Sequence, residues 1–275
     1  MMDVFPFLYG YFSFVVFVLG CCVGSFLNVC IYRIPREESV VAPRSHCPHC
    51  GKMIAWYDNI PLLSYVLLRA RCRHCGGTIS IRYFLVEGLV GVLFLLVWIQ
   101  YGVDARTPIY WMVVSGLALG TFVDLEYMII PDRVTLGGIV AGLVLSPLVP
   151  SLHGESTWLG GLVAALIGAA AGAGLLWAVA IVGKWVFKKD AMGMGDVKLL
   201  GGLGALLGWR AVLFTVMLSS VLGSALSGAL VLARRKQWQS RVPYGPYLAV
   251  AAVIWILWGK GWWDAYVGWA SGGVL

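Results

Sequence analysis

Charge is scarce in this sequence. Only 12% of its 275 residues are Asp, Glu, Lys or Arg, whereas 60% are hydrophobic. A composition this apolar excludes a soluble domain, and the hydrophobic residues fall into long runs separated by short polar stretches. We therefore predict an all-α, polytopic membrane protein. Windows of about 20 apolar residues place eight transmembrane helices near 6–32, 83–101, 109–130, 133–150, 158–183, 197–209, 211–232 and 244–259.

The first apolar run lacks the features of a cleavable signal peptide. Asp3 precedes it where a signal peptide carries basic residues, and the run continues through Cys30 without a small-residue cleavage pattern. We therefore expect residues 1–32 to remain as the first transmembrane helix.

The basic residues are distributed unevenly between the two sides of the predicted membrane. If the N-terminus lies outside, the 20 Lys and Arg residues all lie on the cytosolic side except Arg106, Arg210 and Lys260. This bias follows the positive-inside rule and predicts the orientation. The net charge of +7 also suits attraction to anionic lipids of the inner leaflet, and it requires no nucleic-acid partner.

The stretch 197–209 is short for a membrane crossing and could instead be re-entrant. About 12 residues rise about 18 Å, whereas the hydrocarbon core is about 30 Å thick. Without this crossing, four basic residues would move to the outer side: Arg234, Arg235, Lys236 and Arg241. The charge distribution therefore favours eight crossings.

The segment 33–82 is rich in Arg, Pro, His and Cys and is too small to build much hydrophobic core unaided. Four of the seven cysteines form two Cys-x-x-Cys-Gly motifs within it, at Cys47 and Cys50 and at Cys72 and Cys75. Four thiolates in this pattern suit tetrahedral zinc. The glycine after each second cysteine lets the backbone turn back toward sulfur. We therefore predict a structural zinc site.

Other assignments of these cysteines are open. They could form disulfides or stay free thiols, although a reducing cytosol disfavours disulfides. His46, His49 and His74 flank the motifs and could compete as ligands, but four cysteines already complete the coordination shell.

Acidic residues are rare within the apolar runs, and two of them stand out. Asp124 lies inside one run, and Asp196 ends the sequence Gly193-Met194-Gly195-Asp196. Holding a carboxylate in hydrocarbon costs on the order of a few kcal/mol or more, so an acid there is a candidate functional group. If folding brings the two together, they can share one proton, which is how aspartic proteases activate water. Asp196 alone could equally be a helix N-cap, a role we also expect for Asp132.

Glycines are placed where close backbone approach would be useful. Gly193 and Gly195 would let the chain before Asp196 leave helical geometry and approach an extended peptide. Gly-x-x-x-Gly patterns at 168–172 and 204–208 suit tight packing between helices.

Together these motifs resemble the bacterial type IV prepilin peptidase family, a branch of the GxGD-type membrane aspartic proteases. The matching residues follow the family's order along most of the chain. They are Gly24-Ser25-Phe26-Leu27-Asn28-Val29, Arg33, Pro35, both Cys-x-x-Cys motifs, Arg82-Tyr83-Phe84-Leu85-Val86-Glu87, Asp124, Pro131-Asp132, Gly193-Met194-Gly195-Asp196-Val197-Lys198-Leu199 and Pro243-Tyr244-Gly245-Pro246-Tyr247.

The resemblance implies a bifunctional enzyme of the bacterial inner membrane. It would remove the leader peptide of type IV prepilins and type II secretion pseudopilins at the cytosolic face. It would then methylate the new N-terminus with S-adenosylmethionine. Asp124 and Asp196 would be the catalytic pair. The chain would consist of a first transmembrane helix (1–32), a cytosolic zinc subdomain (33–82) and a protease core (83–275).

The methyl-donor site is not evident from the sequence. No strand leads into a glycine-rich turn of the kind that soluble nucleotide-binding folds use. Asn28, Arg33 and Glu87 lie near the cytosolic ends of the first two predicted helices and could bind donor or substrate. They could equally form interhelical hydrogen bonds or contact lipid head groups.

Two other functions are open at this point. A proton- or cation-coupled transporter would use Asp124 and Asp196 as relay groups and the zinc loop as a regulatory cap. The sequence shows no paired half-helices in two repeats, which speaks against it. A noncatalytic scaffold of a secretion machine would leave both aspartates unexplained.

Overall fold

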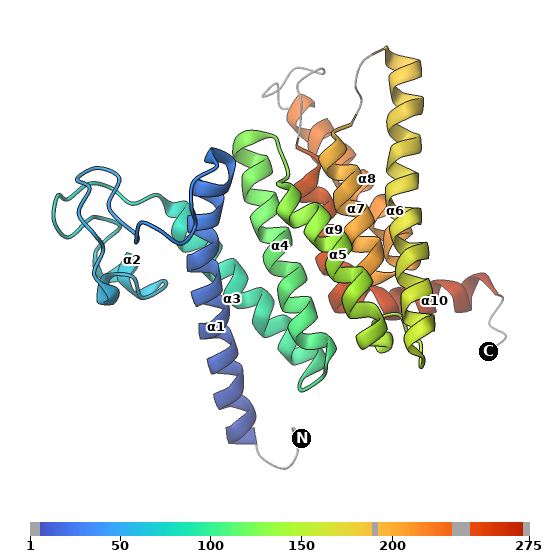
Figure 1. Ribbon diagram of the computed structural model, residues 1–275, viewed down its shortest axis with the longest axis horizontal. Coiled ribbons are helices and arrows are strands. Elements are labelled where there is room, and N and C mark those ends of the chain that lie inside the picture. Colours follow the sequence, from blue (N-terminus) through green and yellow to red (C-terminus); the bar gives the residue numbers. More distant parts are fainter. Residues whose placement is uncertain (1–5, 189–191, 233–242, 272–275) are drawn as a thin grey trace. The chain divides into compact units, whose positions relative to one another are not determined.

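The computed structural model describes residues 6–188, 192–232 and 243–271. Apart from two isolated β-bridges, the regular structure of these residues is helical, which confirms the predicted all-α class (Figure 1). The chain divides into two compact units, Met1–Leu119 and Gly120–Leu275, and the boundary falls within one helix, α4 (Arg106–Tyr127).

The first unit is built on two long helices that lie side by side, α1 (Pro6–Arg33) and α3 (Ile81–Tyr101). Glycines allow their backbones to touch, because a Cβ on Gly20 would lie 2.8 Å from the Cα of Gly91. A Cβ on Gly24 would lie 2.8 Å from the Cα of Glu87. The chain between the two helices has little helix. It contains η1 (Ile34–Arg36), η2 (Trp56–Asp58) and α2 (Leu63–Leu67).

The second unit is organised around a short buried helix, α7 (Met194–Leu207), which packs against α5 and α6 and also contacts α8 and α9. From Asp196 to Leu207 every residue of α7 except Lys198 is buried. The other elements of this unit are α5 (Asp132–Leu148), η3 (Pro150–Leu152), α6 (Trp158–Phe187), α8 (Trp209–Leu232), α9 (Gly245–Ile254), the π-helical segment η4 (Trp255–Gly259) and α10 (Lys260–Ala270).

Contact between α6 and α7 depends on the two Gly-x-x-x-Gly patterns. A Cβ on Gly168 would overlap the carbonyl oxygen of Gly204, and a Cβ on Gly204 would overlap that of Gly168. A Cβ on Gly172 would likewise overlap the carbonyl oxygen of Leu200. The predicted tight helix contact is therefore confirmed, and it brings backbone against backbone.

Each of the eight predicted hydrophobic stretches coincides with a helix, with ends that shift by a few residues. Five of the described helices are long and apolar enough to cross a membrane: Leu8–Arg36, Ile81–Tyr101, Arg106–Tyr127, Trp158–Val186 and Trp209–Ala229. The helices α5 and α7 are shorter, with 17 and 14 residues. Because α7 is buried in protein, its short length leaves little backbone facing lipid.

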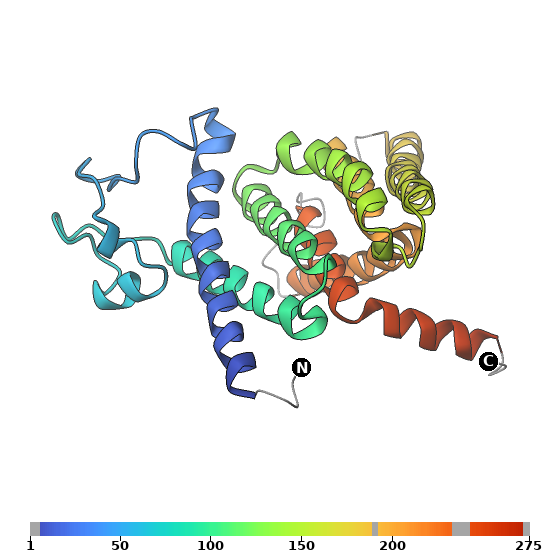
Figure 2. The ribbon, with the colours of Figure 1, turned by 60° about the horizontal axis from the view of Figure 1, so that its bottom comes forward.

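Helix α10 follows the last predicted crossing and was not predicted from the sequence. It presents Trp262, Tyr266 and Trp269 on its exposed surface, where each side chain is more than half exposed. In Figure 1 it runs across the direction of α5 and α6, and Figure 2 shows it extending away from the other helices of this unit. A helix with exposed tryptophan and tyrosine is suited to the interface between lipid and water, and these aromatic residues were the available signal.

The N-cap predicted at Asp132 is wrong. Pro131 occupies the N-cap position of α5, and Asp132 is the first helical residue. The carboxylate of Asp132 instead forms an ion pair with Lys198 of α7, with Nζ 2.7 Å from Oδ1.

Replacing Gly168 by Ala should destabilise the second unit, because the new methyl group would overlap the α7 backbone, which cannot move aside as a side chain can. We expect a loss of about 1–3 kcal/mol, measured by thermal unfolding of the purified protein in detergent. Gly174→Ala is the matched control, since the described residues leave open space around its Cβ position on the same helix. Equal stability of the two variants would contradict the proposed packing.

Candidate functional site

Asp124 lies in the last turn of α4 and is buried, with 6% of its surface exposed. Its Oδ2 accepts a hydrogen bond from the backbone N–H of Gly245, at 3.1 Å. Gly245 is the first residue of α9, so the carboxyl group meets the positive end of a helix. The α4 helix ends soon afterwards, where Met128 adopts a left-handed conformation with φ of 55°.

Glycine at position 245 is required by the closeness of this contact. A Cβ there would lie 2.7 Å from Oδ2 of Asp124. The preceding Tyr244 is held by a hydrogen bond between its hydroxyl and Oγ of Ser219 in α8, at 2.7 Å. From the sequence alone, Pro243-Tyr244-Gly245-Pro246-Tyr247 was only one of the motifs that carry the family resemblance. The glycine between two prolines was the signal for a backbone donor, but it did not identify Asp124 as the acceptor.

Asp196 is the third residue of α7 and is 8% exposed. The N-cap position belongs to Gly193, so the alternative role of Asp196 as an N-cap is wrong. A Cβ on Gly193 would lie 3.4 Å from Oδ2 of Asp196, so the first glycine of the motif lies directly beside the carboxyl group.

Ile130 connects the surroundings of the two aspartates. A Cβ on Gly195 would lie 3.3 Å from the Cβ of Ile130, and a Cβ on Gly245 would lie 3.1 Å from its Cδ1. The start of α7 and the start of α9 therefore converge on one side chain that follows α4. This convergence places Asp124 and Asp196 close enough for the charge of one to act on the other.

The four cysteines of the first unit form a compact cluster. Their sulfur atoms all lie within 4.8 Å of one another, and those of Cys47 and Cys75 are 3.8 Å apart. A tetrahedral metal with metal–sulfur bonds of about 2.3 Å requires sulfur–sulfur distances of about 3.8 Å. The cluster therefore fits a thiolate-bound metal such as zinc.

Both cysteine motifs have the same local structure. Gly51 and Gly76 adopt positive φ angles of 69° and 68°, as the sequence predicted for a turn back toward sulfur. The N–H of Gly51 donates to the carbonyl of Cys47, and that of Gly76 donates to Cys72, each at 2.9 Å. Among the described residues, His46, His49 and His74 are not part of the sulfur cluster.

The surroundings of the cluster favour the thiolate form of Cys72 and disfavour that of Cys75. Backbone N–H groups of Cys75 and His74 lower the pKa of Cys72 to about 6. The N–H of Gly77 favours the thiolate of Cys75, but desolvation and the neighbouring sulfur atoms raise the pKa of Cys75 to about 11. Without a cation, the second thiolate is disfavoured by the first, which is the situation that a bound divalent metal relieves.

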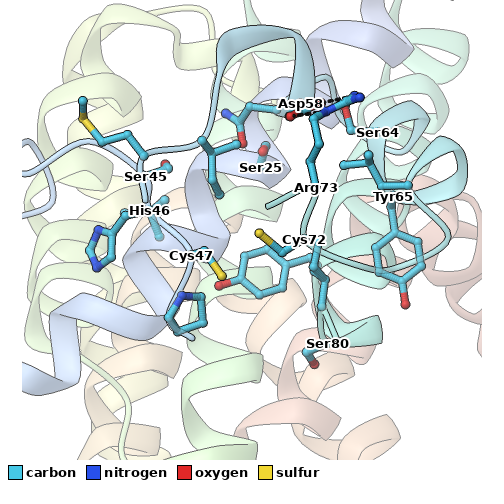
Figure 3. Close-up of a pocket in the computed structure, with 18 of the residues that line it drawn as sticks. Ser25, Ser45, His46, Cys47, Asp58, Ser64, Tyr65, Cys72, Arg73 and Ser80 are labelled. Atoms are coloured by element: carbon cyan, nitrogen blue, oxygen red, sulfur yellow. Dashed lines mark hydrogen bonds and ion pairs between the residues drawn. The ribbon is translucent and has the colours of Figure 1, made fainter. Parts of the chain in front are cut away.

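A cavity of about 750 Å³ lies beside this cluster, between the loop-rich segment and the facing ends of α1 and α3 (Figure 3). Arg33 and Glu87 line it, together with Cys47 and Cys72. Asn28 does not line it. The Nδ2 of Asn28 instead donates to the carbonyl of Tyr83 at 3.1 Å, which holds α1 to α3.

The chain matches two family profiles and several known proteins. The profile described as "Bacterial Peptidase A24 N-terminal domain" matches residues 18–101, and the one described as "Type IV leader peptidase family" matches residues 111–228. A "Prepilin leader peptidase/N-methyltransferase" of Aeromonas hydrophila is 39% identical, with 90% of this chain and 91% of that protein aligned. The chain belongs to the type IV leader peptidase family.

Other relatives agree. A protein of the same name from Pseudomonas putida is 37% identical over 91% of this chain and 92% of its own length. One from Myxococcus xanthus is 43% identical over 81% of this chain, but the alignment spans only 64% of that protein. No solved structure matches the chain.

The family profiles divide the sites between them. The leader-peptidase profile contains Asp124 and Asp196, whereas the N-terminal profile contains all four clustered cysteines and also Arg33 and Glu87 of the cavity. Gly245, which binds Asp124, lies beyond the matched residues. The structure thus adds a backbone donor to the carboxyl pair of the leader-peptidase region.

The sulfur cluster predicts close to one equivalent of a thiolate-binding metal per chain, measured by elemental mass spectrometry of the purified protein. Cys47→Ser and Cys72→Ser should each lose most of it, because three sulfur atoms leave the tetrahedral shell incomplete. Cys22→Ser, in α1, is the control and should keep its metal. A full equivalent of metal in the Cys72→Ser variant would contradict the site.

Proposed function

We propose that this protein removes the leader peptide of type IV prepilins and type II secretion pseudopilins and then methylates the new N-terminus. The names of the relatives contain both activities, leader peptidase and N-methyltransferase. The observation that carries the peptidase assignment is that two buried aspartates, Asp124 and Asp196, lie around Ile130, with Asp124 bound by the N–H of Gly245 at the start of α9.

The proposed catalytic pair works by sharing a proton. One carboxylate takes a proton from water while the water oxygen attacks the scissile carbonyl carbon, and the protonated partner donates to the carbonyl oxygen. The tetrahedral intermediate then breaks its carbon–nitrogen bond, and the leaving nitrogen receives the proton taken from water. The N–H of Gly245 fixes the orientation of Asp124 while this happens.

Methylation is the second proposed step, with S-adenosylmethionine as donor. The lone pair of the new terminal amine attacks the methyl carbon, the carbon–sulfur bond breaks, and its electron pair stays on sulfur. The amine then releases a proton to water.

In this proposal the chain crosses the bacterial inner membrane eight times, with its N-terminus outside. Residues 33–82 and the cytosolic ends of α4 and α7 then share the side where basic residues gather. A basic leader would lie among anionic head groups there, while the apolar segment of the pilin enters the bilayer.

We assign zinc to the four cysteines Cys47, Cys50, Cys72 and Cys75 in a structural role. Zinc would tie together a segment whose own hydrophobic core is small. The transporter alternative receives no support, since the relatives described above are named as peptidases and methyltransferases.

Asp124→Asn and Asp196→Asn should each reduce leader removal by about 10²-fold to 10⁴-fold or more, because an amide can neither accept the proton of water nor supply one. The measurement is mass spectrometry of a prepilin incubated with the purified protein in lipid. Asp104→Asn, two residues before the start of α4, is the control. Its Oδ1 accepts the N–H of Arg106 at 2.8 Å, and an amide oxygen can do the same. Near-normal cleavage by either of the first two variants would reject the peptidase mechanism.

Gly245→Ala should slow cleavage by about 10-fold to 100-fold with little change in KM, because a methyl group 2.7 Å from Oδ2 must displace Asp124. Steady-state kinetics with a prepilin substrate would measure this. Gly137→Ala, on α5, introduces the same methyl group where the described residues leave open space. If both variants cleave at the normal rate, the contact between Gly245 and Asp124 does not contribute to catalysis.

A further inference from the structure

The cavity of the first unit has the size of a small-molecule site. Its volume of about 750 Å³ lies within the range of about 300–1,000 Å³ that is typical of ligand pockets. Helix α1 contributes Phe26, Tyr32 and Arg33, and α3 contributes Tyr83 and Glu87. The opposite wall comes from the cysteine-rich segment, whose Asp58 and Arg73 form an ion pair at 2.6 Å (Figure 3).

Arg33 brings a buried positive charge to this cavity. The residue is 7% exposed, and its guanidinium donates to the carbonyl oxygens of Ser39 and Pro43, each at 2.8 Å. Both acceptors are neutral, and within the described chain no carboxylate forms an ion pair with Arg33. Since a guanidinium has five N–H groups, it retains donors for an anion in the cavity.

Glu87 brings a buried negative charge to the same cavity. It is 7% exposed, and its Oε2 accepts the backbone N–H of Leu62 at 2.8 Å. The hydroxyl of Ser25 is its other partner. Among the residues with a described position, no Lys or Arg pairs with it. A buried carboxylate held only by neutral donors can accept further hydrogen bonds and favours a cation beside it.

We propose that this cavity binds the methyl donor, with Arg33 holding the α-carboxylate and Glu87 the α-ammonium group of its amino-acid end. The proposal rests on the methyltransferase part of the proposed function. The amino-acid end of S-adenosylmethionine carries both groups, a carboxylate that can pair with Arg33 and an ammonium group that can pair with Glu87. The aromatic rings of Phe26, Tyr32 and Tyr83 offer faces for its adenine ring and its sulfonium group.

Asn28, the third candidate from the sequence, has a positioning role in this arrangement. It is completely buried, and it joins α1 to α3 one turn before Arg33 leaves α1. Because Arg33 and Glu87 come from these two helices, the contact made by Asn28 sets how far apart their charges lie.

The test compares two ligands on the full-length protein in lipid nanodiscs by isothermal titration calorimetry. S-adenosylhomocysteine has the amino-acid end, whereas 5′-methylthioadenosine lacks it. Glu87→Gln should weaken binding of S-adenosylhomocysteine by about 10-fold or more and leave that of methylthioadenosine unchanged. Arg33→Lys, which keeps the charge but loses the guanidinium fork, should show the same pattern. Glu37→Gln removes one negative charge from an exposed position that does not line the cavity, and should bind both ligands normally.

Each other outcome overturns a defined part of the proposal. If Glu87→Gln binds S-adenosylhomocysteine as tightly as Glu37→Gln does, the site is elsewhere, even if the unaltered protein methylates a cleaved prepilin. If Glu87→Gln loses both ligands equally while its metal content and melting temperature are normal, Glu87 shapes the cavity and does not bind the amino-acid end. If the unaltered protein cleaves prepilin but transfers no methyl group, the methyltransferase function itself is wrong.

Discussion

The second unit depends on direct contact between the backbone of α7 and those of its neighbours. Glycines at positions 168, 172 and 204 remove the side chains that would otherwise separate α6 from α7. This closeness buries α7 almost completely, so that a helix of 14 residues can lie within an apolar bundle. Because Asp196 is in its first turn, the same packing determines where that carboxyl group lies. The geometry of the acidic pair is therefore a consequence of helix packing far from it in sequence.

In both units, buried charged side chains form hydrogen bonds with neutral backbone groups. Asp124 is bound by the backbone N–H of Gly245, Glu87 by that of Leu62, and Arg33 by two carbonyl oxygens. Neutral partners stabilise a buried charge without cancelling it. Each group therefore keeps its electrostatic effect on a molecule that enters the site, whereas the pair formed by Asp58 and Arg73 largely neutralises itself.

The sequence predicted the helical class, all eight hydrophobic segments and the clustering of the cysteines, because each of these follows from local composition or spacing. The predictions were wrong or absent where a residue's role depends on contacts between segments that are distant in sequence. Asp132 and Asp196 have the residue type of an N-cap, yet Pro131 and Gly193 occupy those positions. The ion pair of Asp132 with Lys198 joins residues of two helices that no local pattern relates.

The same limit applies to the candidate sites. That Gly245 donates to Asp124 could not be predicted, because the two residues are 121 positions apart. Likewise, Asn28, Arg33 and Glu87 were equivalent candidates in the sequence, and only the three-dimensional arrangement separates the two that line the cavity from the one that joins helices. The amphipathic α10 was missed for a different reason, since its aromatic residues lie outside any long apolar run.

The donor to Asp124 has a particular evolutionary property, because it belongs to the main chain. A side-chain donor can be lost through a single codon change, whereas nearly every amino acid supplies the same N–H, and only proline removes it. Mutation at position 245 can therefore alter the bulk beside the carboxyl group but can hardly delete its hydrogen bond. Substitution at position 245 therefore preserves the hydrogen bond to Asp124 but changes the space beside the carboxyl group. Natural variation at this position should be limited by the size of the side chain.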